Sequence, residues 1–521
     1  MALQGILLSP MVAHPFLTLL LLPLILLALR SLYRISFLHP LSHVPGPLLP
    51  PISSLWLTYH AWIGDEASVV HALHEKHGTI VRNGPNSVDI SDGAALAAIY
   101  TERGGFAKTQ FYENFALPDG AQLHNSIFSE IDTAIRAPRA KAVAVLFSTS
   151  NLRQGQDLIY QCVDKLVGRL AEGKKLSQTS GGPLNILNLT RGLAVDAVSS
   201  YLLGRSYDAL SEDSKKKKDE TTAVHRELAE PMSASGMVDT FVAVGRFWYL
   251  PGWAFKLVES WDSWYNANEE VVHSLARVDD FVAGVVSEAE AAIKASQTDE
   301  KTLTSNHPLT SYPARLLQAG FTPSETRAQC KDLIFAGSDS TGMNLATILF
   351  MLAKHQECLD KIREEVLKNK PGFDDLQALP YLRGVVKEGL RLSMANPSRL
   401  PRVVPAGGWT FKHTYFPAGT EISCTPYSLH LNPEVFPDPH EFNPERWIEP
   451  SEEMMRDAIP FGLGSRQCIA RNLATVELYC AVAKIVEAGI LEGAKTLTDR
   501  IEILEWFNSK VIGERIDLTW D

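Results

Sequence analysis

The stretch Phe461–Ala470, near the C-terminal end, reads Phe-Gly-Leu-Gly-Ser-Arg-Gln-Cys-Ile-Ala. Its two glycines allow a tight backbone that residues with a Cβ atom resist, so the amides of residues 465–467 can point at the sulfur of Cys468. The residues that follow have helical spacing, which would place this sulfur near the positive N-terminal end of a helix. We therefore predict a turn that presents one thiolate, a ligand that suits a soft metal.

A buried structural cysteine beside an ordinary turn is the alternative, and two glycines with a cysteine alone would favour it. Phe461 and Arg466 change the balance, because the pattern Phe-x-x-Gly-x-Arg-x-Cys-x-Ala resembles the haem-binding loop of the cytochrome P450 family. In that family the cysteine is the axial ligand of haem iron, the phenylalanine shields the sulfur and the arginine pairs with a haem propionate. Ala470 departs from the glycine that most members carry. The resemblance assigns haem b binding to Cys468, Arg466, Phe461 and Gly464.

Composition limits the class of protein. The 521 residues carry a net charge of −11 with acidic and basic side chains interspersed, which argues against a nucleic-acid binder. The six cysteines form no C-x-x-C pair and no disulfide-like spacing. This usage is typical of a reducing compartment and leaves Cys468 free to be a thiolate.

A second motif lies in a long predicted helix. Residues 322–325, Thr-Pro-Ser-Glu, supply an N-cap hydroxyl, a proline at the first helical position and a glutamate that closes a capping box. Helical spacing then continues to about residue 354. Within it, residues 336–341 read Ala-Gly-Ser-Asp-Ser-Thr and interrupt an apolar pattern. Gly337 would leave room for a ligand, and the Thr341 hydroxyl could bond back to the backbone and locally open the helix.

A helix kink without a catalytic role is the other interpretation of residues 336–341. The stretch is similar to the oxygen-activation motif of the cytochrome P450 family, Ala-Gly-x-Asp-x-Thr, which weighs against that interpretation. The resemblance implies that Thr341 holds dioxygen and water, and that Asp339 helps to relay protons. Gly337 would then border the cofactor.

A third motif is the pair Glu388 and Arg391 on a second predicted helix. Alone, this spacing is most often a surface ion pair of a few tenths of a kcal/mol. The order and spacing of Arg446 downstream resemble the family's buried triad, so we expect Glu388, Arg391 and Arg446 to form a structural cluster that locks the haem-loop region. Such a cluster adds little net stability, but removing one partner strands a charge.

Further arginines are candidates for the haem propionates. Arg402 matches the family's propionate-binding arginine by its distance from Arg391, and Arg399 is the weaker candidate. In the helix that follows residue 131, Arg139 stands at the second of two family positions, with Arg136 near the first. Pro138 between them is unusual in a helix interior.

Substrate contacts are expected in two places. Residues 105–131 are rich in aromatic side chains without clear periodicity, which alone would indicate core packing. The resemblance places this region over the distal haem face, so Phe111 and Phe128 are candidate substrate contacts, as are Phe335 and Ala336 on the long helix. Residues 241–255 are also aromatic and poorly periodic, and fit either core or a membrane-dipping access loop.

The N-terminal region predicts a membrane anchor. Residues 1–29 carry no charged side chain, and this uncharged stretch is longer than the roughly 20 residues that cross a bilayer. The stretch contains no clear signal-peptide cleavage site. Arg30 and Arg34 follow, so the positive-inside rule places the remainder in the cytosol. We expect a single-pass anchor in the endoplasmic reticulum membrane at residues 1–30, a Pro-rich hinge at 31–52 and a catalytic domain at 53–521.

These motifs together resemble the cytochrome P450 family along nearly the whole chain, which implies a mainly α fold with a smaller β-rich subdomain. The implied activity is that of a haem-thiolate monooxygenase, which inserts one oxygen atom from O2 into an apolar small molecule by hydroxylation or epoxidation. The style of the sequence, including Leu-Pro-Arg-Val-Val-Pro at residues 400–405, resembles fungal microsomal members that modify terpenoids, polyketides or alkaloids in secondary metabolism.

Two other classes stay open: a haem-thiolate isomerase or dehydratase that needs no reductase, and a non-catalytic haem- or lipid-binding protein. Thr341 and Asp339 favour oxygen activation over the first class. The sequence has no G-x-G-x-x-G dinucleotide motif, so we expect electrons from a separate membrane-bound NADPH–cytochrome P450 reductase. Lys141 and Arg471 are candidates for its docking site.

Overall fold

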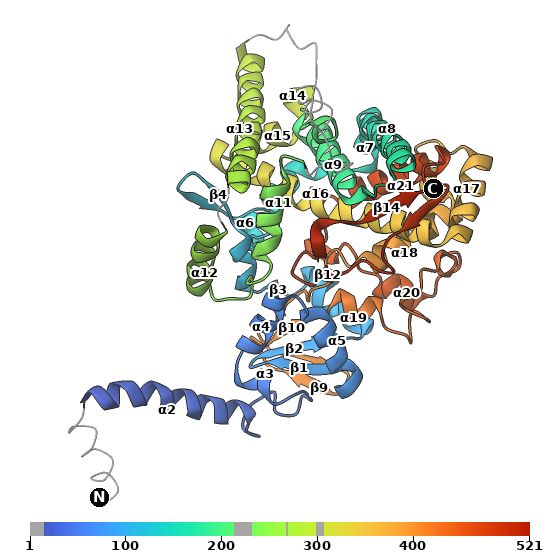
Figure 1. Ribbon diagram of the computed structural model, residues 1–521. Helices are drawn as coiled ribbons and strands as arrows, with labels where there is room; N and C mark the ends of the chain where they lie inside the picture. Colours follow the sequence, from blue (N-terminus) through green and yellow to red (C-terminus); the bar gives the residue numbers. More distant parts are fainter. Residues whose placement is uncertain (1–14, 213–231, 267–268, 299–306) are drawn as a thin grey trace, which may run out of the picture.

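The computed structural model describes residues 15–212, 232–266, 269–298 and 307–521. Within these residues the protein is mainly helical with small β-sheets, as the sequence predicted (Figure 1). Five helices build the body around the site: α8 (Gln156–Ser180), α9 (Ile186–Val198), α16 (Pro323–Lys354), α18 (Pro380–Ser393) and α21 (Arg471–Glu487). The other α-helices described are α2 (Pro15–Ile35), α3 (Leu49–Ile52), α4 (Leu55–Ile63), α5 (Glu66–His77), α6 (Thr133–Val143), α7 (Thr149–Gln154), α11 (Ser235–Val244), α12 (Gly252–Tyr265), α13 (Glu269–Thr298), α14 (His307–Thr310), α15 (Tyr312–Gln318), α17 (Gln356–Asn369), α19 (Pro426–His430) and α20 (Glu452–Asp457).

Helix α16 runs through the middle of the helical body and packs against α9, α18 and α21 (Figure 1). Its predicted capping box is confirmed: the Glu325 amide donates to Thr322 Oγ1 over 3.2 Å, and Glu325 Oε2 accepts from the Thr322 amide over 3.0 Å. The predicted opening of the helix at Thr341 is wrong, because residues 323–354 form one uninterrupted helix. Ser338 and Ser340 bond back to the carbonyls of Ile334 and Ala336, and a carbonyl's second lone pair accepts such a bond without loss of the helical one.

A five-stranded sheet forms the core of the β-rich part, below the helical body in Figure 1. Its strand order is β1 (Ile80–Gly84), β2 (Ser87–Ile90), β10 (Glu421–Ser423), β7 (Arg402–Val403) and β3 (Ala107–Lys108). Strands β2 and β10 are parallel and the other pairs are antiparallel. In the β3–β7 pair, Lys108 is the register partner of Arg402, so this edge of the sheet places two basic residues side by side.

The remaining strands form smaller sheets. One has three strands, in the order β11 (Ala494–Thr496), β14 (Asp517–Trp520) and β6 (Leu184–Asn185). Three are two-stranded: β12 (Ile503–Leu504) with β13 (Lys510–Val511), β4 (Leu117–Asp119) with β5 (Gln122–His124), and β8 (Trp409–Phe411) with β9 (Thr414–Phe416). Among these smaller sheets of the described residues, only the three-stranded one joins distant segments, since β14 near the C-terminus pairs with β6 between α8 and α9.

The N-terminal helix α2 projects away from the body (Figure 1). Residues 1–14 of the predicted anchor lie outside the described part of the chain. Among the helices that the structure describes, none combines the length and the apolar character needed to span a bilayer. The hinge folds back at its end, where Arg34 Nη1 donates to the carbonyl of Ile52 over 2.6 Å.

Candidate functional site

The turn before α21 has the tight backbone that the sequence predicted. Gly462 and Gly464 have φ angles of +64° and +67°, and the Cys468 amide donates to the Phe461 carbonyl over 2.9 Å. A Cβ atom at Gly464 would lie 1.8 Å from the carbonyl oxygen of Tyr100, a distance that no side chain tolerates. The turn can therefore only close against Tyr100 with glycine at this position.

Cys468 is exposed, whereas the five other cysteines are buried. Desolvation by neighbouring protein atoms nevertheless raises the pKa of the Cys468 thiol, while a hydrogen bond from the Ala470 amide and the charge of Arg471 act in the opposite direction. The amide that bonds the sulfur is thus that of Ala470, outside the predicted range 465–467. An accessible thiol in such a setting becomes a thiolate when a metal cation binds it.

Four basic side chains lie close together near this turn, and we call them the cation group: Lys108, Arg136, Arg402 and Arg466. Burial lowers the pKa of Lys108 well below its ordinary value, and the three arginines lower it further, while Asp332 acts weakly in the opposite direction. Burial, followed by Arg136 and Arg402, lowers the pKa of Arg466 to about 10. Among the described residues, none of the four forms an ion pair with a carboxylate.

Buried like charges that lie opposite each other destabilise a sheet, so the cation group needs an anion. A cofactor that carries two carboxylates beside an atom that accepts a thiolate satisfies both the cations and Cys468. The donor set of these residues therefore fits haem, whose two propionates would lie against the cation group and whose iron would face the sulfur.

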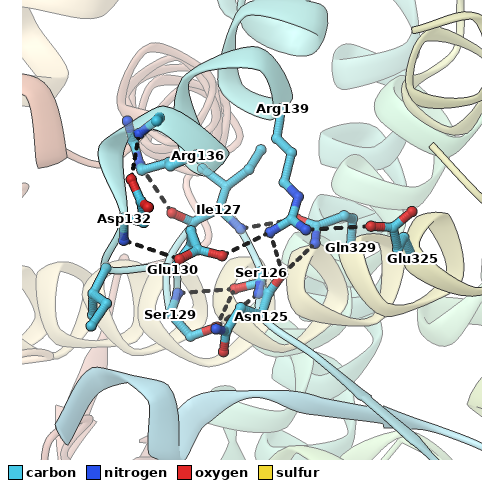
Figure 2. Close-up of polar contacts among 12 residues, drawn as sticks. Asn125, Ser126, Ile127, Ser129, Glu130, Asp132, Arg136, Arg139, Glu325 and Gln329 are labelled. Atoms are coloured by element: carbon cyan, nitrogen blue, oxygen red, sulfur yellow. Dashed lines mark hydrogen bonds and ion pairs between the residues drawn. The ribbon is translucent and has the colours of Figure 1, made fainter. Parts of the chain in front are cut away.

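Arg139, predicted to bind the cofactor, lies in a different setting from the cation group (Figure 2). Its guanidinium pairs with Glu130 over 3.3 Å and Glu325 over 3.4 Å, and donates to the carbonyl of Asn125 over 2.9 Å. Arg136, one turn earlier, is the member of α6 that lies in the cation group. Both carry the same charge on neighbouring turns of one helix, so the sequence could not separate them.

On α16 the predicted motif residues point in several directions. Ala336 is exposed although the helix around it is mostly buried. Gly337 is partly exposed, and a Cβ atom there would lie 2.8 Å from Val198 Cγ2. The missing side chain therefore lets α16 approach α9, and a border with the cofactor at Gly337 stays a prediction. Thr341 is 6% exposed.

Asp339 is buried and paired. Arg191 on α9 donates through Nε to Asp339 Oδ1 over 2.8 Å, and its Nη1 atom donates to Glu514 Oε2 over 2.8 Å. Arg191 thus links the motif acid to the C-terminal loop. The sequence analysis missed Arg191 because it stands 148 positions before Asp339, on a helix with no motif of its own.

The structure brings Glu388, Arg391 and Arg446 together, as the sequence indicated. Glu388 and Arg391 are fully buried and joined by two hydrogen bonds of 2.8 and 2.9 Å, and Arg446 Nε donates to Glu388 Oε1 over 2.9 Å. The indole of Trp447 completes the set, since Nε1 donates to Glu388 Oε2 over 2.8 Å. The cluster joins α18 to the loop that precedes α20.

The predicted substrate contacts lie in aromatic packing. The ring of Phe111 lies 4.1 Å from that of Tyr249, and the ring of Phe335 stacks on Phe241 at 4.7 Å. Phe128 is half-buried and, like Phe111, belongs to an aromatic cluster that contains Tyr112, Phe115, Trp248 and Phe507.

Residues 241–255, which the sequence analysis interpreted as either core or a membrane-dipping loop, contain both buried and exposed aromatic side chains. Phe247, Trp248 and Phe255 are buried, as the core interpretation requires. Trp253 is 73% exposed at the start of α12, where Leu257, Trp261 and Trp264 are exposed too. The outer face of α12 is therefore apolar.

The fold and the site are those of a helical protein suited to hold a cofactor with two carboxylates against a cysteine sulfur. Comparison with known proteins agrees: residues 45–488 match the family Cytochrome P450. The chain is 39% identical to the cytochrome P450 monooxygenase mfmF of Annulohypoxylon moriforme, over 95% of this chain and 98% of that protein. It is 30% identical to the cytochrome P450 monooxygenase tazI of Aspergillus terreus over 88% of each chain, and 29% identical to pisatin demethylase of Fusarium vanettenii over 89% and 86%.

The chain therefore belongs to the cytochrome P450 family, and it is a haem-dependent monooxygenase. Membership implies a haem cofactor, dioxygen as a co-substrate, a small organic substrate and a redox partner.

Proposed function

We propose that the protein inserts one oxygen atom of O2 into an apolar small molecule, by hydroxylation or epoxidation, in fungal secondary metabolism. The observation that carries this proposal is the juxtaposition of the accessible Cys468 with buried cations that have no carboxylate partner. Its relatives support the setting, since they are fungal monooxygenases and one is named for the demethylation of pisatin. Terpenoids, polyketides and alkaloids are the substrate classes we consider.

Cys468 is the proposed iron ligand, and the cation group is proposed to hold the haem carboxylates. When bound, the haem activates dioxygen with electrons supplied from outside the chain. Phe461 would cover the sulfur from the loop side, and Gly464 keeps the loop closed on Tyr100. Arg139 stays a candidate only through its contact with the neighbouring segment.

On the opposite side, Thr341 would orient a water molecule and Asp339 would supply protons to it. Arg191 holds the Asp339 carboxyl group by a hydrogen bond of 2.8 Å, so a proton relay through Asp339 would require this contact to loosen. Phe335, Ala336, Phe111 and Phe128 would form the apolar wall that orients the substrate.

Electrons are proposed to come from NADPH through a separate membrane-bound reductase. Lys141 and Arg471 are both exposed, and Arg471 begins the helix that follows the cysteine turn. Reversing both charges should slow reduction and weaken its dependence on salt, whereas Lys76→Glu on α5 should not. An unchanged rate and salt dependence in the double variant would reject this docking site.

The proposed location is the cytosolic face of the endoplasmic reticulum membrane, with a single-pass anchor near residues 1–30. Two features support contact with a bilayer: the exposed leucines of α2 and the exposed apolar face of α12. Tryptophan side chains such as Trp253 and Trp261 favour the interface between lipid and water.

The carbon monoxide difference spectrum of the reduced protein tests the function. Wild-type protein should give the strongly red-shifted Soret band of a haem-thiolate, and Cys468→Ala should lose it. Cys358→Ala is the matched control, because this cysteine is buried on α17, and it should retain the band. A haem-loaded wild-type protein without the band would overturn the ligand assignment.

Thr341→Ala tests oxygen activation separately. Haem should stay bound, while the hydrogen peroxide released per NADPH consumed should rise several-fold, because protons are no longer delivered in order. Thr347→Ala, at a buried hydroxyl two turns further along α16, is the control and should leave this ratio unchanged. Equal ratios in both variants would remove Thr341 from the mechanism.

A further inference from the structure

The segment of residues 125–132 joins β5 to α6 without regular structure and passes beside the site (Figure 2). We call it the bridging segment. Its carbonyls accept hydrogen bonds from the cation group: Arg136 Nε reaches Ile127 O over 3.0 Å and Lys108 Nζ reaches Phe128 O over 2.6 Å. Arg466 donates to Glu130 O over 2.6 Å and to Ile131 O over 2.7 Å. The segment is thus tied directly to the turn that carries Cys468.

The cation group holds the bridging segment only in part. The same side chains would bind the carboxylates of the cofactor, and a charged acceptor forms stronger hydrogen bonds than a neutral carbonyl. When the cofactor binds, these donors are shared between the carboxylates and the segment. Attachments that the cofactor does not compete for are needed to keep the segment in one place; Arg139 supplies one, through Glu130 and the carbonyl of Asn125, and Asp332 on α16 bonds the side chain of Ser126.

Gln329 on α16 is the attachment that binds the backbone of the segment on both sides of Ser126 (Figure 2). Its Oε1 atom accepts from the amide of Ile127 over 2.9 Å, and its Nε2 atom donates to the carbonyl of Asn125 over 3.0 Å. One side-chain amide therefore pairs with an N–H and a C=O of the segment, as a neighbouring strand would. Gln329 is 2% exposed, so loss of these bonds would leave buried polar groups without partners.

The position of the bridging segment decides where Phe128 lies. The ring of Phe128 packs against those of Tyr112, Phe115 and Phe507 at centroid distances of 5.7, 5.5 and 5.6 Å. Phe128 directly follows Ile127, whose amide Gln329 binds. A shift of the segment therefore moves one wall of the apolar cluster, while Cys468 and α16 can stay in place.

We propose that Gln329 is a positioning residue that fixes the bridging segment to α16 and thereby sets how tightly the apolar part of a ligand is bound. The inference rests on the proposed function, because it takes Phe128 as part of the substrate wall. Gln329 does not touch the reacting atoms, so its effect falls on binding of the apolar part and not on ligation of the iron.

Amide hydrogen exchange of the haem-loaded protein tests the attachment without any use of activity. Gln329→Met keeps the size of the side chain but removes both hydrogen bonds, so exchange in residues 125–132 should rise at least tenfold. Thr326→Val is the matched control: Thr326 lies one turn earlier on α16, is fully buried, and its hydroxyl has no partner. Exchange there should match wild type. Wild-type exchange in Gln329→Met would overturn the proposal.

Two iron-binding probes test the effect on binding: imidazole and 1-phenylimidazole, which carries an additional apolar ring. Their dissociation constants follow from the shift of the Soret band. Gln329→Met should weaken 1-phenylimidazole about tenfold and change imidazole less than twofold, since only the first touches the apolar wall. Equal weakening of both probes, or of neither, would overturn the role in binding.

Gln329→Asn covers the case in which Gln329→Met fails to fold. The shorter amide cannot reach both backbone groups, so the same two changes should appear with smaller size. Failure of the proposed function would show differently, as a missing haem-thiolate band in wild type with the exchange pattern unaffected. A thiolate band together with unchanged exchange in Gln329→Asn would reject the positioning role alone.

Discussion

The protein contains two buried clusters of cations that differ in one respect. Around Glu388, both Arg391 and Arg446 contact a carboxylate of the chain itself. In the cation group, no carboxylate of the described residues lies within ion-pair distance of Lys108 or Arg402, and the charge of Asp332 acts on Lys108 only from further away. A cluster that carries its own counter-charge serves the fold, and one that lacks it is prepared for an anion from outside.

The Glu388 cluster also satisfies its remaining donors. Arg391 donates to the carbonyls of His430 and Pro439 over 2.8 and 2.6 Å, and Arg446 to that of Pro437 over 3.0 Å. Lys108 and Arg402 also donate hydrogen bonds, to the carbonyls of Phe128 and Pro401 over 2.6 and 2.9 Å, but they lie opposite each other on paired strands. Desolvation and repulsion both oppose this pair until an anion is present.

Removing the carboxylate from the compensated cluster should have the largest effect. Glu388→Ala leaves two buried arginines without a counter-charge, which should cost about 3–5 kcal/mol of unfolding free energy and most of the folded yield. Urea unfolding of the purified protein measures it. Glu445→Ala is the control, since it breaks an exposed ion pair with Lys361 and should cost less than about 1 kcal/mol. Equal losses would contradict the comparison.

Several parts of the fold and of the candidate site could be predicted from local sequence. The capping box of α16 and the turn before Cys468 depend on residues a few positions apart, so their chemistry is visible in the sequence. The partners of Glu388 came from order and spacing within a family pattern. The predicted membrane helix was not found among the described helices.

The rest depends on contacts between distant segments. Arg399 and Arg402 are three positions apart, yet Arg399 pairs with Glu66 while Arg402 faces Lys108. Only the pairing of strands decides which arginine has a counter-charge. The sequence also does not show that Gly337 lies against α9, or that Gln329 forms hydrogen bonds with residues 125 and 127. Each of these contacts depends on how two separate elements pack together.

His430 offers a second test, since it lies against the compensated cluster. Burial, followed by the charge of Arg391, lowers the pKa of His430 to about 3, while its Nε2 accepts from the amide of Ile459. As the pH falls, His430 is therefore protonated at a lower pH in the folded state than in the unfolded chain. Stability is complete above about pH 6.5 and should fall by about 1.4 kcal/mol per pH unit below it.

Urea unfolding between pH 7 and pH 4.5 measures this slope. His430→Gln retains an acceptor and a donor but cannot be protonated, so its stability should depend less on pH by about 3 kcal/mol over that range. An identical slope in wild type and His430→Gln would mean that other groups cause the acid sensitivity. A flatter slope would show that the cluster tolerates no further positive charge.

The smallest change in stability should come from the uncompensated cluster. Lys108→Met loses a hydrogen bond to the carbonyl of Phe128, worth about 1 kcal/mol, but relieves the repulsion from Arg402, so the haem-free protein should change by less than about 1 kcal/mol. Haem release, followed by transfer to apomyoglobin, should nevertheless become several-fold faster. Lys331→Met is the matched control: this lysine is equally buried on α16, but pairs with Asp279 over 2.7 Å. Lys331→Met should destabilise the haem-free protein more than Lys108→Met does. It should leave the rate of haem release unchanged, because the ammonium group of Lys331 is already paired with a carboxylate and does not bind the cofactor.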